Sequence, residues 1–72
     1  MHYLPEALIL DLNDRAHMLY DFGHEVDDVS DSMLTYDVNQ VCSENGYVLT
    51  PNQFKLAKQA LELLFIQQHG KL

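Results

Sequence analysis

Disulfide bonds within the chain are excluded, because Cys42 is its only cysteine. A lone cysteine is typical of proteins in a reducing compartment, where a buried thiol behaves as a small hydrophobic group. Nothing in the sequence places a histidine or a helix N-terminus beside Cys42, so a catalytic thiolate has no support. The three glycines are scattered and form no phosphate-binding loop. The serines also lack a recognisable nucleophile motif, and we expect no enzymatic activity and no cofactor.

Long hydrophobic runs are also missing. The longest, residues 7–10 and 63–66, fall far short of the roughly 20 residues that a membrane-spanning helix needs. Residues 1–6 contain no basic region ahead of an apolar stretch, so we expect no secretory signal. The sequence therefore predicts a soluble, cytoplasmic protein without a membrane partner.

Basic residues are scarce as well. Eleven acids stand against four bases, which gives a formal net charge of −7. Residues 6–44 hold ten acids and one base (net −9), whereas residues 45–72 hold one acid and three bases (net +2). An acidic protein repels phosphate groups and anionic lipids, which disfavours nucleic-acid and membrane binding. A protein partner with a basic surface would instead be attracted.

The chain is short enough to form a single helical domain over residues 1–72. At this length, folding buries only about 60% of the surface that the unfolded chain exposes. Because no disulfide can reinforce so small a core, oligomerisation is a common way to complete it.

The clearest predicted element is a helix over residues 51–68. Thr50 is placed to act as its N-cap, and Gln53 stands at the third helical position, where it completes a capping box. Pro51 suits the first turn, because its missing N–H would have no partner there. Gly70 follows the last turn and marks the end of the helix.

Two further helices are predicted upstream. The first covers residues 5–22, where apolar residues recur at spacings of three, four and seven. These residues are Leu8, Leu12, Leu19 and Phe22, with Ile9 and Ala16 alongside them. The second covers residues 29–43, with Asp27, Asp28 or Ser30 as its cap and Gly46 after its end. Its apolar face consists of Met33, Leu34, Val38, Val41 and Cys42.

The second helix has an alternative. Residues 34–38 also alternate as a β-strand would, and residues 47–49 could pair with them. An isolated two-stranded ribbon is only marginally stable, so we favour the helix. The expected fold is an all-α, three-helix bundle.

The last helix is apolar on nearly all of its faces. Phe54, Ala57, Leu61, Leu64 and Phe65 form an obvious core stripe. Four more apolar residues lie outside that stripe: Leu56, Ala60, Leu63 and Ile66. A helix that is apolar all round is normally buried all round, and a chain of 72 residues has too little protein to surround it. We therefore expect these four residues to form a homodimer interface. The alternative is a monomer with a few harmless exposed apolar residues.

Five acids are concentrated within eleven residues: Asp21, Glu25, Asp27, Asp28 and Asp31. Calcium-binding loops are also rich in acids, but this segment lacks the alternating ligands, central glycine and closing glutamate of an EF-hand. Helix capping would use two of the five. We predict that they form an acidic face that contacts a basic protein surface. The alternative is that they only cap and solvate the helices.

A metal site has weaker support. Asp14, His17 and Asp21 have spacings that put their side chains on one face of the first helix, and His24 would lie at or beyond its end. Histidine and carboxylate at these spacings can bind a divalent metal. Known helical metal motifs add a second ligand cluster or a fixed glutamate. Neither is present, so we predict no metal.

A helix–turn–helix is the remaining alternative, because a glycine-containing turn precedes the last helix. That helix would then read DNA with Asn52, Gln53, Lys55 and Lys58. The acidity of the domain and its shortage of arginine disfavour direct nucleic-acid binding.

These features favour a small acidic regulator or inhibitor, of the type encoded by phages and mobile elements, that binds a basic protein surface and dimerises through its last helix. The second hypothesis is a structural or assembly subunit. Its apolar last helix would pack into a larger complex, and its acids would serve solubility.

Overall fold

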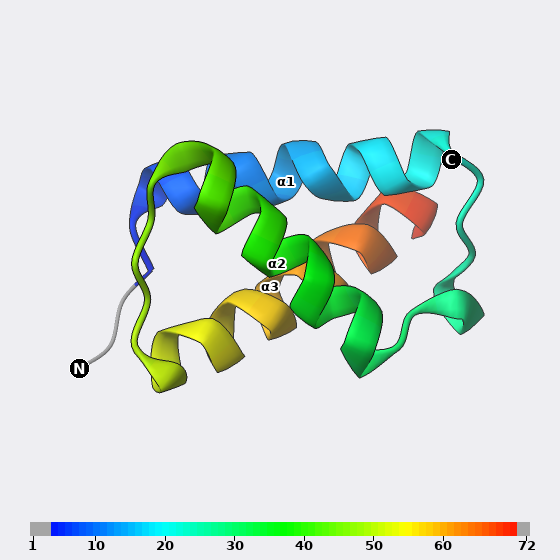
Figure 1. Ribbon diagram of the computed structural model, residues 1–72. Coiled ribbons are helices and arrows are strands. Elements are labelled where there is room, and N and C mark those ends of the chain that lie inside the picture. The colour runs from blue at the N-terminus through cyan, green and yellow to red at the C-terminus, as the bar shows by residue number, and fades with distance from the viewer. Residues whose placement is uncertain (1–3, 71–72) are drawn as a thin grey trace.

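The computed structural model describes residues 4–70, which form three α-helices and one short 3₁₀ helix. In chain order they are α1 (Glu6–Asp21), η1 (Val26–Asp28), α2 (Asp31–Asn45) and α3 (Pro51–Gly70). In Figure 1, α1 extends along one side of the molecule, and α2 crosses α3 below it. The most extensive packing is between α1 and α3. The predicted all-α fold of three packed helices is confirmed.

The core is formed by one apolar face of each helix. Its buried residues are Leu8, Leu12, Ala16 and Leu19 of α1, Leu34, Val38 and Val41 of α2, and Ala57, Leu61 and Phe65 of α3. Within each helix these residues are three or four positions apart, so their side chains project from one face. Most of the core residues predicted from the sequence are therefore correct.

Phe22 is an exception, because 71% of its surface is exposed. The helix ends at Asp21, and Phe22 is the first residue beyond it. Gly23 then adopts a positive φ of 88°, which redirects the chain away from the helical path. The predicted core face included Phe22 because the apolar periodicity continues through that residue, whereas the helix ends one residue earlier.

Residues 34–38 are helical, so the alternative of a strand is wrong. Helix α2 begins at Asp31, two residues later than predicted, because Ser30 is the N-cap and its hydroxyl accepts a hydrogen bond from the Met33 N–H at 3.2 Å. At the other end, Gly46 adopts the left-handed conformation with φ 75°. The Tyr47 N–H then donates to the Cys42 carbonyl at 2.9 Å, which closes the last turn.

An ion pair joins α1 to α2 inside their interface. The Arg15 guanidinium donates to Asp37 Oδ1 through Nε at 3.0 Å and through Nη2 at 2.7 Å. Asp37 is only 4% exposed, so Arg15 supplies the opposite charge that offsets the cost of burying a carboxylate. Arg15 is the only basic residue among residues 6–44, and it is used here in holding the fold together.

The predicted capping box of α3 is confirmed. The Thr50 hydroxyl accepts the Gln53 N–H at 3.1 Å, and Gln53 Oε1 accepts the Thr50 N–H at 2.9 Å. The helix extends to Gly70, two residues beyond its predicted end. Its last turn is held against the segment after α1, because His69 Nε2 lies 2.9 Å from the His24 carbonyl oxygen.

Within residues 4–70, no helix combines the length and the apolarity that crossing a membrane requires.

Candidate functional site

The most distinctive surface is the outward face of α3. It carries the four residues predicted as an oligomer interface: Leu56, Ala60, Leu63 and Ile66. Leu63 is 60% exposed, Ile66 is 42% exposed and Leu56 is 38% exposed, while Ala60 is half-buried beside them. Their spacings of four, three and three place them along one side of the helix. We call this set the α3 face.

The α3 face gathers its apolar residues on one side of the helix, with the exposed amides Gln59 and Gln67 among them. A helix of 20 residues is about 30 Å long, and the longest dimension of the whole molecule is 33 Å. The α3 face therefore lies on a helix that spans nearly the full length of the molecule. Single exposed leucines are ordinary on a protein surface, but contiguous apolar patches mark interaction sites.

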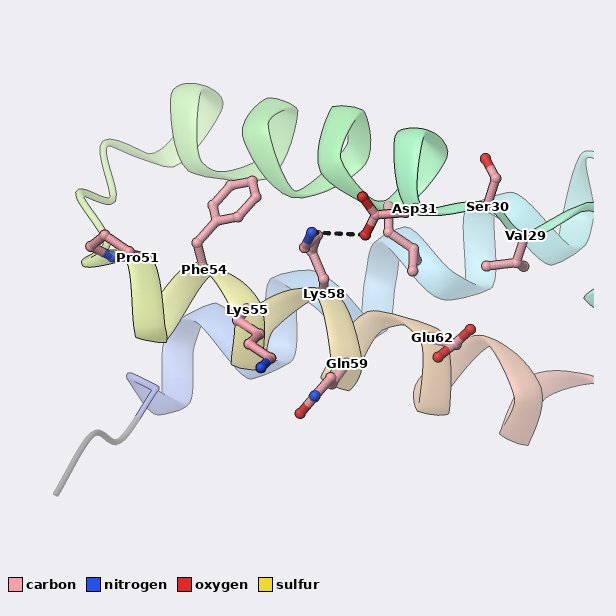
Figure 2. A pocket seen from close by; sticks show the side chains of 10 residues that line it. Val29, Ser30, Asp31, Pro51, Phe54, Lys55, Lys58, Gln59 and Glu62 are labelled. Atoms are coloured by element: carbon pink, nitrogen blue, oxygen red, sulfur yellow. Dashed lines mark hydrogen bonds and ion pairs between the residues drawn. The ribbon is translucent and has the colours of Figure 1, made fainter.

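One edge of the α3 face carries charged and polar side chains. Lys55 and Glu62 are seven residues apart, two helical turns, and both are exposed. Exposed Gln59 lies between them along the helix (Figure 2). Within residues 4–70, neither Lys55 nor Glu62 has an ion-pair partner.

A groove between α2 and α3 lies beside this edge (Figure 2). Its volume is about 470 Å³, and its apolar lining residues include Val29, Leu34 and Phe54. Lys58 crosses from α3 to α2, where its Nζ lies 2.8 Å from Asp31 Oδ1. The groove was not predicted from the sequence, because its walls come from two helices that only tertiary packing brings together.

The five acids predicted as a binding face lie between the end of α1 and the start of α2, at one end of the molecule (Figure 1). All of them are exposed: Asp21, Glu25, Asp27, Asp28 and Asp31. We call this set the acidic segment. Its members follow one another along a single connection, with η1 at its centre.

Four members of the acidic segment have local partners. Asp21 lies 3.2 Å from His17 Nε2, and Asp31 pairs with Lys58. Glu25 and Asp28 form a capping box at the start of η1, in which the Asp28 carboxylate accepts the Glu25 N–H at 3.1 Å and the Glu25 side chain accepts the Asp28 N–H. Within residues 4–70, Asp27 has no such contact. Contacts within the fold therefore involve four of the five acids, whereas helix capping was expected to use two.

The histidines do not assemble a metal centre within the part of the chain that the structure describes. No group of three or more histidine, cysteine, aspartate or glutamate side chains is placed to hold a metal ion there. His17 pairs with Asp21, and its Nδ1 lies 3.4 Å from Gln68 Oε1. The helical spacing of Asp14, His17, Asp21 and His24 thus brings only two of the four together.

Cys42 and the residues of the helix–turn–helix alternative are engaged in the fold. Cys42 is half-buried against the core, and burial raises the pKa of its thiol, which disfavours the reactive thiolate. Of the four residues that would read DNA, Gln53 belongs to the capping box and Lys58 to the ion pair with Asp31. Only Asn52 and Lys55 would remain for bases and phosphates.

No protein-family model, curated protein or solved structure matches the chain. Its function therefore has to be inferred from the α3 face, the groove and the acidic segment.

Proposed function

We propose that the chain is a small, non-enzymatic protein–protein interaction module, which dimerises through the α3 face and binds a basic protein surface through the acidic segment. In this role it would act as a regulator or inhibitor of its partner. The observation that carries the proposal is the exposure of Leu56, Leu63 and Ile66 along one side of α3.

The hydrophobic effect supports dimerisation. Apolar side chains in water raise the free energy of the molecule in proportion to their exposed area. Pairing two α3 faces would remove these side chains from water in both copies at once. A chain of this size has few other means of covering them, because its own α1 and α2 pack on the opposite side of the helix.

Electrostatics supports a basic protein as the second partner. The acidic segment concentrates like charges at one end of a molecule whose net charge is already −7. Such a charged surface raises the association rate and the selectivity of binding more than the affinity itself. The same charge repels nucleic acids, so the basic surface would belong to a protein.

The test of the acidic segment uses Glu25 and Asp27, two of its three members that do not form an ion pair within residues 4–70. A Glu25→Gln, Asp27→Asn variant removes two charges from the segment. The matched control, Asp14→Asn, Glu44→Gln, removes two exposed charges elsewhere. The partner would be recovered from the native host by affinity purification, and its association rate would be measured over a range of salt concentrations.

We expect the Glu25→Gln, Asp27→Asn variant to associate more slowly and to respond less to salt than the control does. If both variants bind like the unmodified chain at low salt, the acidic segment is not the binding surface.

The second candidate function, an assembly subunit, is favoured by the same α3 face. In that case the face would be covered by other proteins of a larger complex. Sedimentation of the purified chain separates the two functions. A stable small oligomer supports the regulator that dimerises, whereas aggregation that co-expressed partners relieve supports the assembly subunit.

A further inference from the structure

We infer that two copies of the chain pair their α3 helices antiparallel, around a two-fold axis beside Gln59. This inference rests on the proposed dimerisation and adds the orientation and the register of the two helices.

The residue order along the α3 face supports this register. Leu56 lies three residues before Gln59, and Leu63 lies four residues after it. An antiparallel copy therefore brings its Leu63 opposite Leu56, and the two-fold axis repeats the contact on the other side. Half-buried Ala60 lies next to the axis, where its small side chain would allow the two helices to approach closely.

The charges along the edge of the face follow the same symmetry. Lys55 lies four residues before Gln59, and Glu62 lies three residues after it. The midpoint of Lys55 and Glu62 lies one residue before that of Leu56 and Leu63, so the antiparallel arrangement places Lys55 of each copy within about 3 Å, along the helix axis, of the level of Glu62 of the other. A parallel two-fold pair would instead place the two charged edges on opposite sides of the seam, so Lys55 would not meet Glu62 of the other copy.

Both charged side chains are free to form this contact. Lys58 is already paired with Asp31 across the groove, whereas Lys55 and Glu62 have no ion-pair partner within residues 4–70. Both are exposed and lie on α3 beside Gln59 (Figure 2). In the dimer, Lys55 of each copy would pair with Glu62 of the other, so all four side chains would have an opposite charge nearby.

The distribution of charge over the whole chain also favours a second copy at α3 rather than elsewhere. Residues 6–44 carry a net charge of −9, whereas residues 45–72 carry +2. Two copies therefore repel each other least when they approach through their α3 helices.

A charge swap tests the register. The full-length variants are Lys55→Glu, Glu62→Lys and the double variant Lys55→Glu, Glu62→Lys, and the dimer dissociation constant would be measured by sedimentation equilibrium. We expect each single variant to weaken the dimer by about tenfold, because two ion pairs become two like-charge contacts. The double variant restores both pairs and should return the dissociation constant to near that of the unmodified chain.

Glu62→Lys is the decisive variant. It makes the chain less acidic, so general repulsion between copies would fall and the dimer would tighten if the register were wrong. The matched control is Glu44→Lys, which makes the same change of charge on exposed α2 surface. We expect the control to tighten the dimer slightly and Glu62→Lys to weaken it. Circular dichroism would verify that each variant is folded.

Cross-linking gives a second measurement that does not depend on charge. In a Cys42→Ser background, Asn52→Cys and Gln67→Cys lie seven residues before and eight residues after Gln59. An antiparallel dimer forms a disulfide between the Asn52→Cys variant and the Gln67→Cys variant when the two are mixed and oxidised. A parallel dimer forms a disulfide between two copies of the Asn52→Cys variant.

The outcomes separate this inference from the proposed function. A dimer that Glu62→Lys tightens, or that cross-links only between identical positions, overturns the antiparallel register and leaves dimerisation intact. A chain that stays monomeric at millimolar concentration overturns both.

Discussion

The ion pair between Arg15 and Asp37 joins α1 and α2 at a point where water has little access. Asp37 is 4% exposed, and a buried carboxylate that loses its partner keeps the cost of its desolvation. We therefore predict that Arg15→Ala lowers the free energy of unfolding by roughly 3 kcal/mol, as measured by urea denaturation. At a protein concentration low enough to keep the chain monomeric, Lys55→Ala removes an exposed base that has no ion-pair partner within residues 4–70, and it should change stability little. An Arg15→Ala variant as stable as Lys55→Ala would show that the pair contributes nothing to the fold.

Tyr47 makes the stability of the fold sensitive to alkaline pH. Burial raises the pKa of its phenol, and the hydrogen bond of 3.1 Å to Asp11, with the negative charge of that residue, raises it further. Because the pKa is higher in the folded state, the stabilising contribution is fully present below the ordinary value of 10.0 and is lost as the pH rises through the folded value.

We expect the midpoint of thermal unfolding to fall above about pH 10. A Tyr47→Phe variant should lose less stability over that range, although it is less stable at neutral pH because the hydrogen bond to Asp11 is gone. The measurement is thermal unfolding from pH 7 to pH 11. Equal losses in the two proteins would contradict the role assigned to Tyr47.

At the scale of the elements, the start of α3 depends on its capping box. Thr50→Ala removes the hydroxyl that accepts the Gln53 N–H, and the loss of such a cap typically costs about 1 kcal/mol. In a domain of this size we expect the melting temperature to fall by roughly 4–8 °C. Thr50→Ser keeps the hydroxyl and should retain most of the stability. If Thr50→Ala and Thr50→Ser have the same melting temperature, the hydroxyl cap does not stabilise the fold.

The elements also show which features can be predicted from the sequence. Helix caps can be predicted from the sequence, because the groups that they join lie within a few residues of each other. Examples are the N-caps Ser30 and Thr50, and Gly46 at the C-terminal end of α2. The end of α1 was predicted one residue too late, because the periodicity of apolar residues continues through Phe22 although the helix does not. Element η1 was not predicted, because three residues are too few for a periodic signal.

Contacts between elements could not be predicted, and they decide what the charged residues do. The pair of Arg15 with Asp37 spans 22 residues, and the pair of Lys58 with Asp31 spans 27. Both depend on how the helices cross. The same holds for the groove between α2 and α3. In contrast, helical periodicity alone separates Leu56, Leu63 and Ile66 from the buried residues, and all three are exposed, whereas Ala60 packs against the core. The role of the α3 face as an interface stays a prediction.

At the scale of the whole molecule, the proposed dimerisation would link stability to concentration. Any interaction that occurs only in the folded state stabilises it, so the melting temperature of a folding dimer rises with the concentration of protein. We predict such a rise for the unmodified chain, measured by scanning calorimetry over a wide range of concentration. Leu63→Gln should abolish the rise, because it places a polar group in the α3 face. Its melting temperature at low concentration should change little, since Leu63 is 60% exposed in the monomer.

Leu61→Ala provides the opposite pattern. Leu61 is fully buried, and truncating a buried leucine costs about 2–5 kcal/mol. That loss occurs within each copy, so the variant should melt lower at every concentration while the dependence on concentration persists wherever it still folds. Leu61→Ala and Leu63→Gln, two residues apart on α3, would thus distinguish the loss of core packing from the loss of the proposed dimer contact. A melting temperature of the unmodified chain that is independent of concentration would instead mean that the α3 face remains in water or is covered by a different protein.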